Sequence, residues 1–319
     1  MSKSLRIVFM GTPHFAIPTL EKIHQSDHTV VGVVTPPDKP RGRGKKLLPP
    51  PVKQFALDNG ISPVLQPVKM RDADFVEALR KLKADLFVVV AFRILPEAVF
   101  TMPPLGTINL HPSELPKYRG AAPLNWTILN GETETAISTI FIKKEIDAGN
   151  IIIQEKRDIH PDETVGTLHD RFAVDGAEIV LRSIEMIASG TVEPMEQDAS
   201  LATPAPKITK ETCRLDFNQP AKQVRQWIHG LSPVPGAYTF YQGDMFKIFF
   251  ADLVDEEKQH DIPGTILEAQ KESILVACNP GTLNLREVQI QGRKRLKTGD
   301  FLRGFQLDKG VVLGKSASE

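Results

Sequence analysis

Hydrophobic positions in the first half of the chain form short continuous runs that alternate with segments of helical spacing. The short runs are rich in aliphatic and β-branched residues and lie at 5–10, 29–34, 86–91 and 107–110. Such runs are typical of strands that are buried on both faces of a sheet. The intervening segments place apolar side chains on one side and charged side chains on the other, at 17–23, 51–59 and 73–82. Strands that alternate with amphipathic helices predict an α/β domain with a mostly parallel, Rossmann-like sheet.

The second half of the chain has a different pattern. Two more strand-like runs, at 136–142 and 151–155, precede a long helical segment at about 163–189. Residues 190–208 are rich in Thr, Pro and Ala and have no sustained period, which indicates a linker. After the linker come one helical segment and several short strand-like runs, at 221–229, 237–241, 245–250, 265–268, 274–278 and 283–289. Such a series of short strands predicts a small OB-like β-barrel. We therefore expect an α/β domain over 1–189, a linker over 190–208 and an OB-like domain over 209–319.

Composition limits the classes of protein that this chain can represent. At 319 residues, of which 41% are apolar and 24% charged, it is an ordinary globular chain with two domains. Lys plus Arg equals Asp plus Glu, at 39 each, so a nucleic-acid site must be a local patch. Cys213 and Cys278 are far apart, which argues against a disulfide framework or a zinc site. No run is long enough for a signal peptide or a membrane span, so we expect a cytoplasmic protein without membrane contact.

Candidate chemistry begins in the run at 107–111. Asn109 and His111 are two residues apart, and residues i and i+2 of a strand point to the same face. Pro112 and Pro116 then take the chain into a loop, because proline cannot donate to a sheet ladder. An amide donor beside an imidazole suits a reaction that develops an oxyanion while a proton moves.

A carboxylate could complete this pair. Asp147 follows the strand expected at 136–142, which we expect to lie beside the strand that carries His111, so that the carboxylate would orient the imidazole. In open α/β sheets ligands bind at the carboxyl ends of strands, which is where we expect all three groups. Each motif alone is more often structural, since Asp-Ala-Gly is a common turn. Their joint occurrence around one proline loop favours catalysis. The remaining histidines lack such neighbours and are interpreted as surface or packing residues: 14, 24, 28, 160, 169, 229 and 260.

These motifs resemble those of the folate-dependent formyltransferases. The resemblance rests on Asn-Leu-His-Pro-Ser at 109–113, Leu-Pro and Arg-Gly in the following loop, and Asp-Ala-Gly at 147–149, and it extends over almost the whole chain. It implies a Rossmann-type catalytic domain, an OB-like C-terminal domain and catalytic roles for Asn109, His111 and Asp147. It also implies 10-formyltetrahydrofolate as formyl donor, without a metal. Asn109 would stabilise the oxyanion, and His111 would serve as general base and then as general acid.

The resemblance also implies a folate site made by two segments. Ser113, Glu114, Leu115 and Pro116 would line the donor pocket, although Glu114 stands where the family usually has Leu. A second segment, Arg93, Ile94 and Leu95, would border the pterin ring. It departs from the common pattern, which has Tyr-Gly and one more residue before Ile-Leu-Pro. Packing between a strand and a helix is an equally good interpretation of this second segment.

A basic segment at 35–50 narrows the resemblance to the members of the family that act on methionyl initiator tRNA. It has five basic residues, one acidic residue, five prolines and two glycines, so we expect neither helix nor strand. Loops of this length are often functional, and basic loops can follow a phosphate backbone. Taken alone, the segment favours a solvated surface loop. In a chain that also carries the catalytic candidates, we expect Arg43, which matches the family's arginine, to contact the acceptor stem together with Arg41, Lys45 and Lys46. A weaker candidate is the cluster of Arg293, Lys294, Arg295 and Lys297.

The leading hypothesis is transfer of a formyl group from 10-formyltetrahydrofolate to the α-amino group of methionyl initiator tRNA by a monomeric bacterial enzyme of translation initiation. A sugar-nucleotide formyltransferase is the nearest alternative, because Ala-Pro-Leu-Asn-Trp at 122–126 also occurs in that branch. A glycinamide ribonucleotide formyltransferase would need neither the basic loop nor the second domain. A non-catalytic RNA-binding protein would not need the three catalytic candidates.

Overall fold

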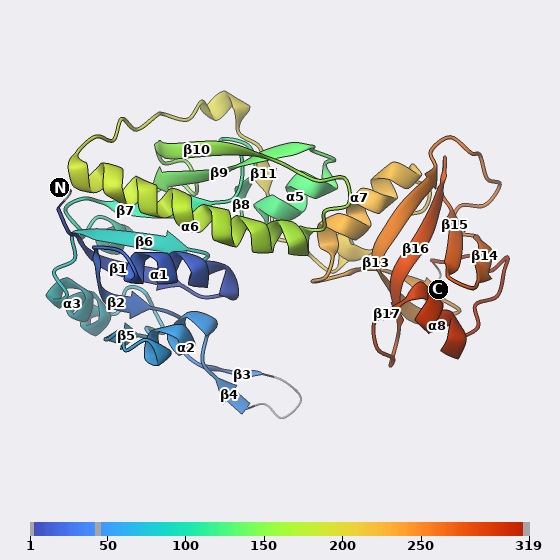
Figure 1. Cartoon of the computed structure of the whole chain (residues 1–319), viewed down its shortest axis with the longest axis horizontal. Helices are drawn as coiled ribbons and strands as arrows, with labels where there is room; N and C mark the ends of the chain where they lie inside the picture. The colour runs from blue at the N-terminus through green and yellow to red at the C-terminus, as the bar shows by residue number, and fades with distance from the viewer. Residues whose placement is uncertain (1–2, 42–45, 315–319) are drawn as a thin grey trace. The chain divides into compact units, whose positions relative to one another are not determined.

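The computed structural model describes residues 3–41 and 46–314 and consists of two compact units (Figure 1). Unit 1 comprises Met1–Pro123, Glu134–Arg157 and His169–Ala205. Unit 2 comprises Leu124–Thr133, Asp158–Leu168 and Pro206–Glu319. Two short segments of the expected α/β domain, 124–133 and 158–168, therefore pack with the second unit, and residues 190–205 of the expected linker pack with the first.

The core of unit 1 is a seven-stranded sheet in the order β10-β9-β7-β6-β1-β2-β5. Its strands are β1 (Arg6–Gly11), β2 (Thr29–Val34), β5 (Val64–Leu65), β6 (Leu86–Val90), β7 (Thr107–His111), β9 (Glu134–Phe141) and β10 (Ile151–Asp158). The pairs β2–β5, β1–β2, β1–β6 and β6–β7 are all parallel. Along this part of the sheet the strand order reverses between β1 and β6, as in Rossmann-like folds, which confirms the predicted fold class.

The strand β9 breaks the parallel pattern. It pairs with β7 in the antiparallel direction, so that His111 lies opposite Ser138 and Ile108 lies opposite Phe141. The carboxyl end of β9 is therefore beside the beginning of β7. Three residues of strand separate that end from His111, which is about 10 Å.

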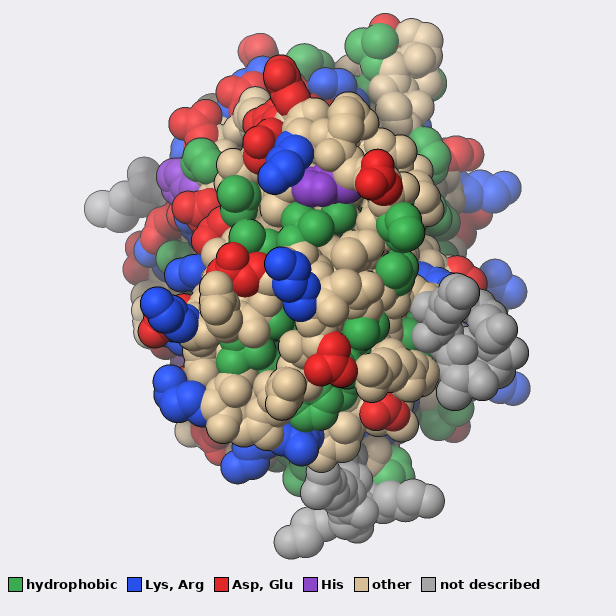
Figure 2. Space-filling view, turned by 90° about the vertical axis from the view of Figure 1, so that its right-hand side faces the viewer, with side chains coloured by type: hydrophobic (Ala, Val, Ile, Leu, Met, Phe, Trp, Pro, Cys, Tyr) green, Lys and Arg blue, Asp and Glu red, His purple; other side chains and the backbone are tan. Residues whose placement is uncertain are grey.

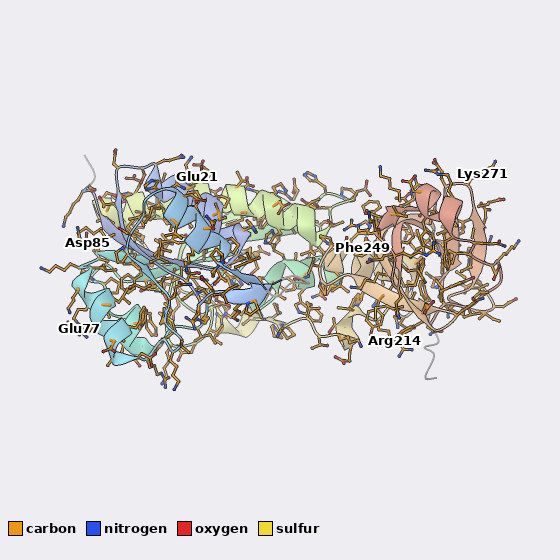
Figure 3. All side chains as sticks on the ribbon, turned by 90° about the horizontal axis from the view of Figure 1, so that it is seen from below. Glu21, Glu77, Asp85, Arg214, Phe249 and Lys271 are labelled. Atoms are coloured by element: carbon orange, nitrogen blue, oxygen red, sulfur yellow. The ribbon has the colours of Figure 1, made fainter. Side chains whose placement is uncertain are left out.

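Helices cover both faces of this sheet. They are α1 (Ile17–His24), preceded by the 3₁₀ turn η1 (His14–Ala16), α2 (Pro51–Asp58), α3 (Ala73–Lys81), α4 (Glu97–Phe100) and α6 (Val165–Ser189). On one face, Phe75 and Leu79 of α3 pack with Val8 and Val89. Elsewhere Gly176 of α6 leaves no room above Leu110, because a Cβ there would meet the Leu110 side chain at 2.8 Å. At the start of β6 the Asp85 carboxylate, labelled in Figure 3, accepts a hydrogen bond of 2.8 Å from the backbone of Arg6.

Two segments expected to lack regular structure contain strands. In the basic segment, β3 (Lys39–Arg41) and β4 (Lys46–Leu48) form an antiparallel hairpin that projects from the sheet in Figure 1, so the prediction of no strand there was wrong. Pro40 is tolerated because a two-stranded ribbon leaves one edge of each strand unpaired. In the expected linker, the turn η2 (Ala199–Leu201) is followed by β11 (Pro204–Ala205), which pairs with β8 (Arg119–Gly120).

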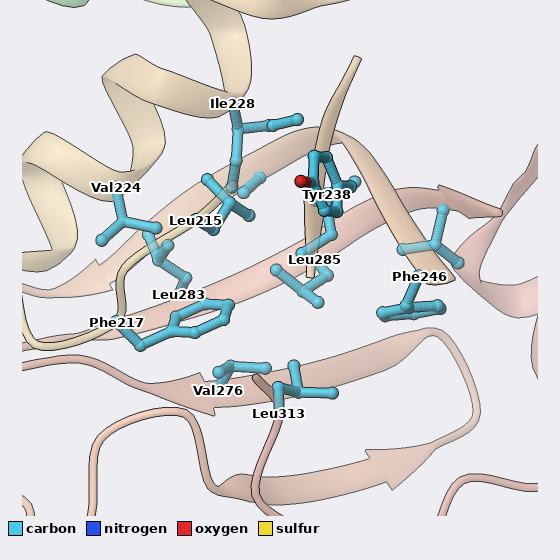
Figure 4. Close-up of a cluster of buried hydrophobic side chains, with 14 of the residues drawn as sticks. Leu215, Phe217, Val224, Ile228, Tyr238, Phe246, Val276, Leu283, Leu285 and Leu313 are labelled. Carbon is cyan, nitrogen blue, oxygen red and sulfur yellow. The ribbon is translucent and has the colours of Figure 1, made fainter. Parts of the chain in front are cut away.

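Unit 2 is an antiparallel, OB-like β domain around an apolar core. Its sheet has the order β12-β13-β16-β15-β14, and β17 pairs with β16. Its elements are α5 (Pro123–Leu129), η3 (Glu211–Cys213), α7 (Ala221–Leu231), β12 (Ala237–Tyr241), β13 (Asp244–Asp255), β14 (Ile266–Gln270), β15 (Ser273–Ala277), β16 (Thr282–Ile290), β17 (Leu296–Lys297) and α8 (Thr298–Gly304). Figure 4 shows side chains from α7, the strands and the segments beside them meeting in this core, among them Val224, Phe246 and Leu285. None of the helices in the described ranges is long and apolar enough to cross a membrane.

Candidate active site

Strand β7 carries two of the candidate residues on one face of the sheet. Asn109 lies within the strand and His111 is its last residue. Hydrogen bonds to β6 on one side and to β9 on the other fix the backbone at Asn109. The His111 side chain is 4% exposed, whereas Asn109 is half-buried. The alternation expected from the sequence therefore places an amide and an imidazole on one face of a rigid strand.

The His111 ring is held by one hydrogen bond and faces one carboxylate. Its Nε2 lies 2.9 Å from the carbonyl oxygen of Tyr118, and since a carbonyl can only accept, Nε2 carries the proton. Its Nδ1 lies 3.6 Å from Oδ2 of Asp147, which is too long for a hydrogen bond but close for an ion pair. Nδ1 is therefore the nitrogen that is free to accept a proton.

Asp147 reaches His111 by a different route from the one that the sequence suggests. The expectation that all three groups follow carboxyl ends of strands on one edge was wrong, because β9 is antiparallel to β7 and ends near Ile108. The loop at 142–150 must instead turn back along β7 toward His111. Asp147 adopts a left-handed backbone (φ 52°), and its Oδ2 accepts a hydrogen bond of 3.0 Å from the backbone N–H of Gly120.

Gly149 lets this loop approach the end of β9. A Cβ built on Gly149 would lie 1.5 Å from the carbonyl oxygen of Phe141, so no other residue fits the backbone in this position. The adjoining Asn150 carbonyl accepts a hydrogen bond of 3.0 Å from the Phe141 N–H. The glycine of the Asp-Ala-Gly motif thus has a steric function in the return of the loop.

Asn109 differs from its neighbours in the hydrogen bonding of its side chain. Within the described part of the chain, its carboxamide makes no hydrogen bond to another residue. The backbone groups of the strand are already paired with β6 and β9. The amide is therefore available to a ligand at the face where the His111 ring lies.

The loop after His111 satisfies most of its polar groups internally. The Ser113 hydroxyl donates to the Lys117 carbonyl at 2.7 Å, and the Ser113 carbonyl accepts a hydrogen bond from Ser138 at 2.7 Å. Leu115 is 3% exposed and packs with Ile140 and Ile151, and Pro116 is half-buried. What this loop can offer a ligand is consequently its shape and backbone rather than the Ser113 hydroxyl.

Glu114 is engaged by two lysines. Its carboxylate lies 3.2 Å from Nζ of Lys117 and 3.3 Å from Nζ of Lys156. Partial burial raises the pKa of this carboxyl, but hydrogen bonds from Lys117 and Lys156 outweigh that effect and bring the pKa below its ordinary value. The residue that departs from the family's usual Leu is thus a charged group with its own partners.

The segment Arg93, Ile94 and Leu95 is divided between the surface and the core. The Arg93 guanidinium donates to the carbonyls of Pro67 at 2.9 Å and Val68 at 3.1 Å, and burial lowers its pKa. Ile94 is 74% exposed, while Leu95 is 7% exposed and belongs to the core cluster of α3. Of the three side chains, Ile94 is the most accessible to a ligand.

The basic candidates lie around the β3–β4 hairpin. Arg43 and Lys45 are outside the described residues, and Arg41 and Lys46 are paired through their backbones where the two strands meet. A partly buried network holds the preceding segment: Lys53 donates to the Asp38 carboxylate at 2.8 Å and to Gln66 at 2.7 Å. The hairpin is therefore fixed at its base.

The C-terminal basic cluster is partly occupied by contacts of its own. Arg293 donates to the Gly304 carbonyl at 2.8 Å, and Arg295 pairs with Glu287 at 2.5 Å and lies over the Phe249 ring, which Figure 3 labels. On the face of the molecule shown in Figure 2, basic and acidic side chains are interspersed. These contacts weaken the case for this cluster as a phosphate-binding surface.

Comparison with known proteins shows the family. The family model for formyl transferases matches residues 5–184 of the sequence, and the family model for the formyl transferase C-terminal domain matches residues 207–306. A methionyl-tRNA formyltransferase from Bacteroides thetaiotaomicron is 46% identical over 98% of this chain and 99% of its own length. The chain belongs to the methionyl-tRNA formyltransferase family.

Solved structures show the same fold at lower identity. An N-formyltransferase from Helicobacter canadensis, determined with folinic acid and dTDP-3-aminofucose, has a TM-score of 0.68 at 19% identity and covers 88% of this chain and 98% of its own. A variant of HypX from Aquifex aeolicus has a TM-score of 0.66 at 20% identity over 96% of this chain, which spans only about half (51%) of HypX. In this methionyl-tRNA formyltransferase family member, no group of three or more His, Cys, Asp or Glu residues among those described could hold a metal ion.

Sequence reasoning missed the residues that support the site from the segment after α6. Gln197 and Thr203 contact the loops that carry Asp147 and Tyr118. Neither Gln197 nor Thr203 belongs to a motif or a periodic pattern, and for that reason the segment was interpreted as a linker. The sequence carried no signal for Gln197, which stands between Glu196 and Asp198 in a polar stretch.

Proposed function

We propose that this protein transfers a formyl group from 10-formyltetrahydrofolate to the α-amino group of methionyl initiator tRNA. The observation that carries the proposal is the meeting of Asn109, His111 and Asp147 in a member of this family. His111 and Asp147 lie 3.6 Å apart, and the amide of Asn109 projects from the same strand face as His111. An amide donor, a base and a carboxylate are the groups that acyl transfer to an amine requires.

The three residues divide the chemistry among them. Nδ1 of His111 accepts a proton from the attacking amine, because Nε2 keeps its own proton for the Tyr118 carbonyl. Asp147 attracts the positive charge that the ring then gains. The same Nδ1 returns the proton to the departing nitrogen, while the Asn109 amide donates to the formyl oxygen as negative charge develops there.

The folate donor supplies the formyl carbon, whose bond to the folate nitrogen breaks as the bond to the amine forms. The fit of the site to such a donor rests on the Asn109 carboxamide, which has no partner within the described chain. We propose that the backbone of the loop at 113–116 and the exposed apolar side chain of Ile94 contact the donor. On either side of Ile94, Arg93 is held by its hydrogen bond to the Pro67 carbonyl and Leu95 by core packing. Ser113, Glu114, Leu115 and Pro116 belong to the donor side of the site.

The acceptor is proposed to be a tRNA because of the basic hairpin. Arg41, Arg43, Lys45 and Lys46 fall within six residues, and the Asp38–Lys53–Gln66 network anchors the segment that leads into them. Clustered cations on an anchored hairpin suit a phosphate backbone. We propose that residues 209–319 supply further tRNA contacts, and that the enzyme acts as a monomer in the bacterial cytoplasm, where initiator tRNA enters translation.

A sugar-nucleotide amine is the second candidate acceptor. It is favoured by the Ala-Pro-Leu-Asn-Trp motif at 122–126 and by the fold shared with an enzyme crystallised with a dTDP-amino sugar. A sugar nucleotide has no extended phosphate backbone for the basic hairpin to bind, so this candidate does not account for the hairpin.

One parallel assay distinguishes the candidates. Formyl-labelled 10-formyltetrahydrofolate is offered with methionyl initiator tRNA, glycinamide ribonucleotide or a dTDP-amino sugar at equal concentration. We expect label in the tRNA alone. Label in either small amine and none in the tRNA would overturn the proposed substrate, and no label in any acceptor would overturn the proposed activity.

A further inference from the structure

The loop at 142–150, which carries Asp147, needs contacts with other segments to bring the Asp147 carboxylate to His111. It begins where β9 ends, beside the start of β7 and three strand residues away from His111, and it includes a non-glycine residue with a left-handed backbone. Such backbones are less favourable for residues other than glycine and persist where surrounding contacts impose them. The contacts that impose this conformation therefore decide where the Asp147 carboxylate lies.

Gln197 makes the contacts that hold this loop. Its Nε2 donates to the carbonyl of Asp147 at 2.9 Å and to the carbonyl of Gly149 at 2.6 Å. Its Oε1 accepts from the Arg119 guanidinium, at 2.7 Å from one terminal nitrogen and 3.1 Å from Nε. Gln197 is 8% exposed, so these bonds are largely shielded from water. One side chain thus joins the Asp147 loop to the loop that follows His111.

The orientation of this carboxamide is fixed by the chemistry of its partners. Both carbonyls can only accept and the guanidinium can only donate, so exchanging oxygen and nitrogen would break every contact. All four hydrogen-bonding positions of the amide are used, and none remains for a substrate. Gln197 therefore acts on the reaction only through the groups that it holds.

The same segment also supports His111. The Thr203 hydroxyl accepts a hydrogen bond of 2.9 Å from the N–H of Tyr118, whose carbonyl binds Nε2 of His111. β11 continues this support by pairing with Arg119 and Gly120. Gly120 is required there, because a Cβ would meet the Ala205 carbonyl at 2.6 Å. Residues 197–205 therefore reach both members of the His111–Asp147 pair.

We propose that Gln197 is a positioning residue of the active site, which sets the distance between Asp147 and His111 by fixing the return of the 142–150 loop. The inference rests on the proposed function for its kinetic consequences, although the loop geometry does not depend on the identity of the acceptor. Because Gln197 touches neither substrate, its loss should lower kcat and leave both KM values nearly unchanged. A displacement of about 1 Å in a catalytic group can reduce the rate by about 100-fold.

The test uses two variants of the full-length protein. Gln197→Leu keeps the shape and removes all four bonds, whereas Gln197→Glu keeps an acceptor for Arg119 and removes both donors to the loop. We expect both to lower kcat by about 10- to 100-fold, with each KM within about twofold of the wild-type value. If the Leu variant does not fold, the Glu variant decides the question, because it retains the Arg119 contact.

A matched control separates positioning from general destabilisation. Ser183→Ala removes a fully buried hydroxyl of unit 1 that bonds Thr139 and the Ile179 carbonyl, away from the 142–150 loop. It should lower the melting temperature in the same way as Gln197→Leu while leaving kcat unchanged. If the Gln197 variants only lower the melting temperature, the proposal is wrong.

Coupling to Asp147 gives a second readout. In an Asp147→Asn background, Gln197→Leu should change kcat by less than about twofold, since the group that it positions is already disabled. An undiminished effect in that background would overturn the proposal. Hydrogen–deuterium exchange of the peptide at 142–150 should be about tenfold faster in Gln197→Leu than in Ser183→Ala. This last measurement needs no activity, so faster exchange in a protein that formylates nothing would refute the proposed function and retain the positioning role.

Discussion

His111 of unit 1 and His229 of unit 2 are both almost completely buried, and their surroundings are opposite. His111 of unit 1 is 3% exposed and His229 of unit 2 is 2% exposed. Both place Nε2 near a backbone carbonyl, at 2.9 Å from Tyr118 and 3.1 Å from Ala251. Burial and this hydrogen bond therefore do not distinguish a catalytic candidate from a core residue.

The charges around the rings make the distinction. His229 stacks on Phe250 with ring centroids 4.5 Å apart, and burial together with the nearby Arg225 lowers its pKa from 6.5 to about 4. His111 instead faces the Asp147 carboxylate at 3.6 Å and shares its strand face with Asn109. A carboxylate and an amide beside a buried imidazole fit the role proposed for His111, whereas burial and the neighbouring cation hold the pKa of His229 too low for such a role.

The largest expected effect comes from removing the groups that make His111 different. Replacing His111, Asn109 or Asp147 by Ala should lower kcat by about two orders of magnitude or more in each case. Steady-state kinetics with the folate donor and methionyl initiator tRNA measure this, with circular dichroism to verify folding. The matched control is His229→Gln, which should retain kcat. Near-normal turnover in His111→Ala would remove the proposed proton-transfer role.

Acid should destabilise the protein through His229. In the folded state its pKa is about 4, whereas the unfolded chain binds the proton near the ordinary value of 6.5. The free energy of unfolding is thus unaffected above pH 6.5 and falls as the pH decreases from 6.5 to 4. At about 1.4 kcal/mol for each pH unit, the loss is about 3 kcal/mol. Urea denaturation across this range should show it, and His229→Gln should remove most of this slope; an equal slope in the variant would mean that other groups dominate.

The basic hairpin should affect the acceptor only. Neutralising Arg43, Lys45 and Lys46 should raise the KM for tRNA and leave donor binding unchanged, because these residues have no chemistry of their own. For each phosphate that the variant no longer binds, the slope of log affinity against log salt should decrease by about 0.7–0.9. Kinetics of single and triple variants across a salt series measure both quantities. Unchanged tRNA kinetics at every salt concentration would reduce the segment to a solvated loop.

The smallest effect is expected at Glu114, a carboxylate beside the site that faces lysines rather than His111. Glu114→Gln removes ion pairs with Lys117 and Lys156 at a position where about a quarter (26%) of the side chain is exposed. Partly exposed pairs contribute about 0–1 kcal/mol, so the free energy of unfolding should change by less than about 1 kcal/mol. The donor KM should change by less than about threefold if the backbone of this loop carries the contact. A rise of about tenfold or more would show that the carboxylate itself contacts the donor.

Local patterns determined much of the fold. Runs of buried aliphatic residues predicted most of the parallel strands, since only strands covered on both faces are continuously apolar. Spacing by two residues placed Asn109 and His111 on one face, because side chains alternate along a strand whatever surrounds it. The position of the Asp-Ala-Gly motif after the strand expected at 136–142 indicated that Asp147 lies near Asn109 and His111.

The sequence failed where the answer depends on contacts between distant segments. Strand direction at β9 is one case: the same residues would alternate equally well in either direction, so the return of the Asp147 loop could not be read from them. The β3–β4 hairpin is another, because backbone pairing can override a composition rich in proline and glycine.

What the sequence by itself determined was the spacing that puts Asn109 and His111 on one strand face, since residue type and strand periodicity are local properties. What the tertiary structure decided was how they are held. Gln197 lies 86 residues after His111 in a segment without a pattern, and only folding brings its carboxamide to the Asp147 loop. A hydrogen bond depends on distance in space and leaves no period in the chain, which is the physical reason that the support of the site had to be found in three dimensions.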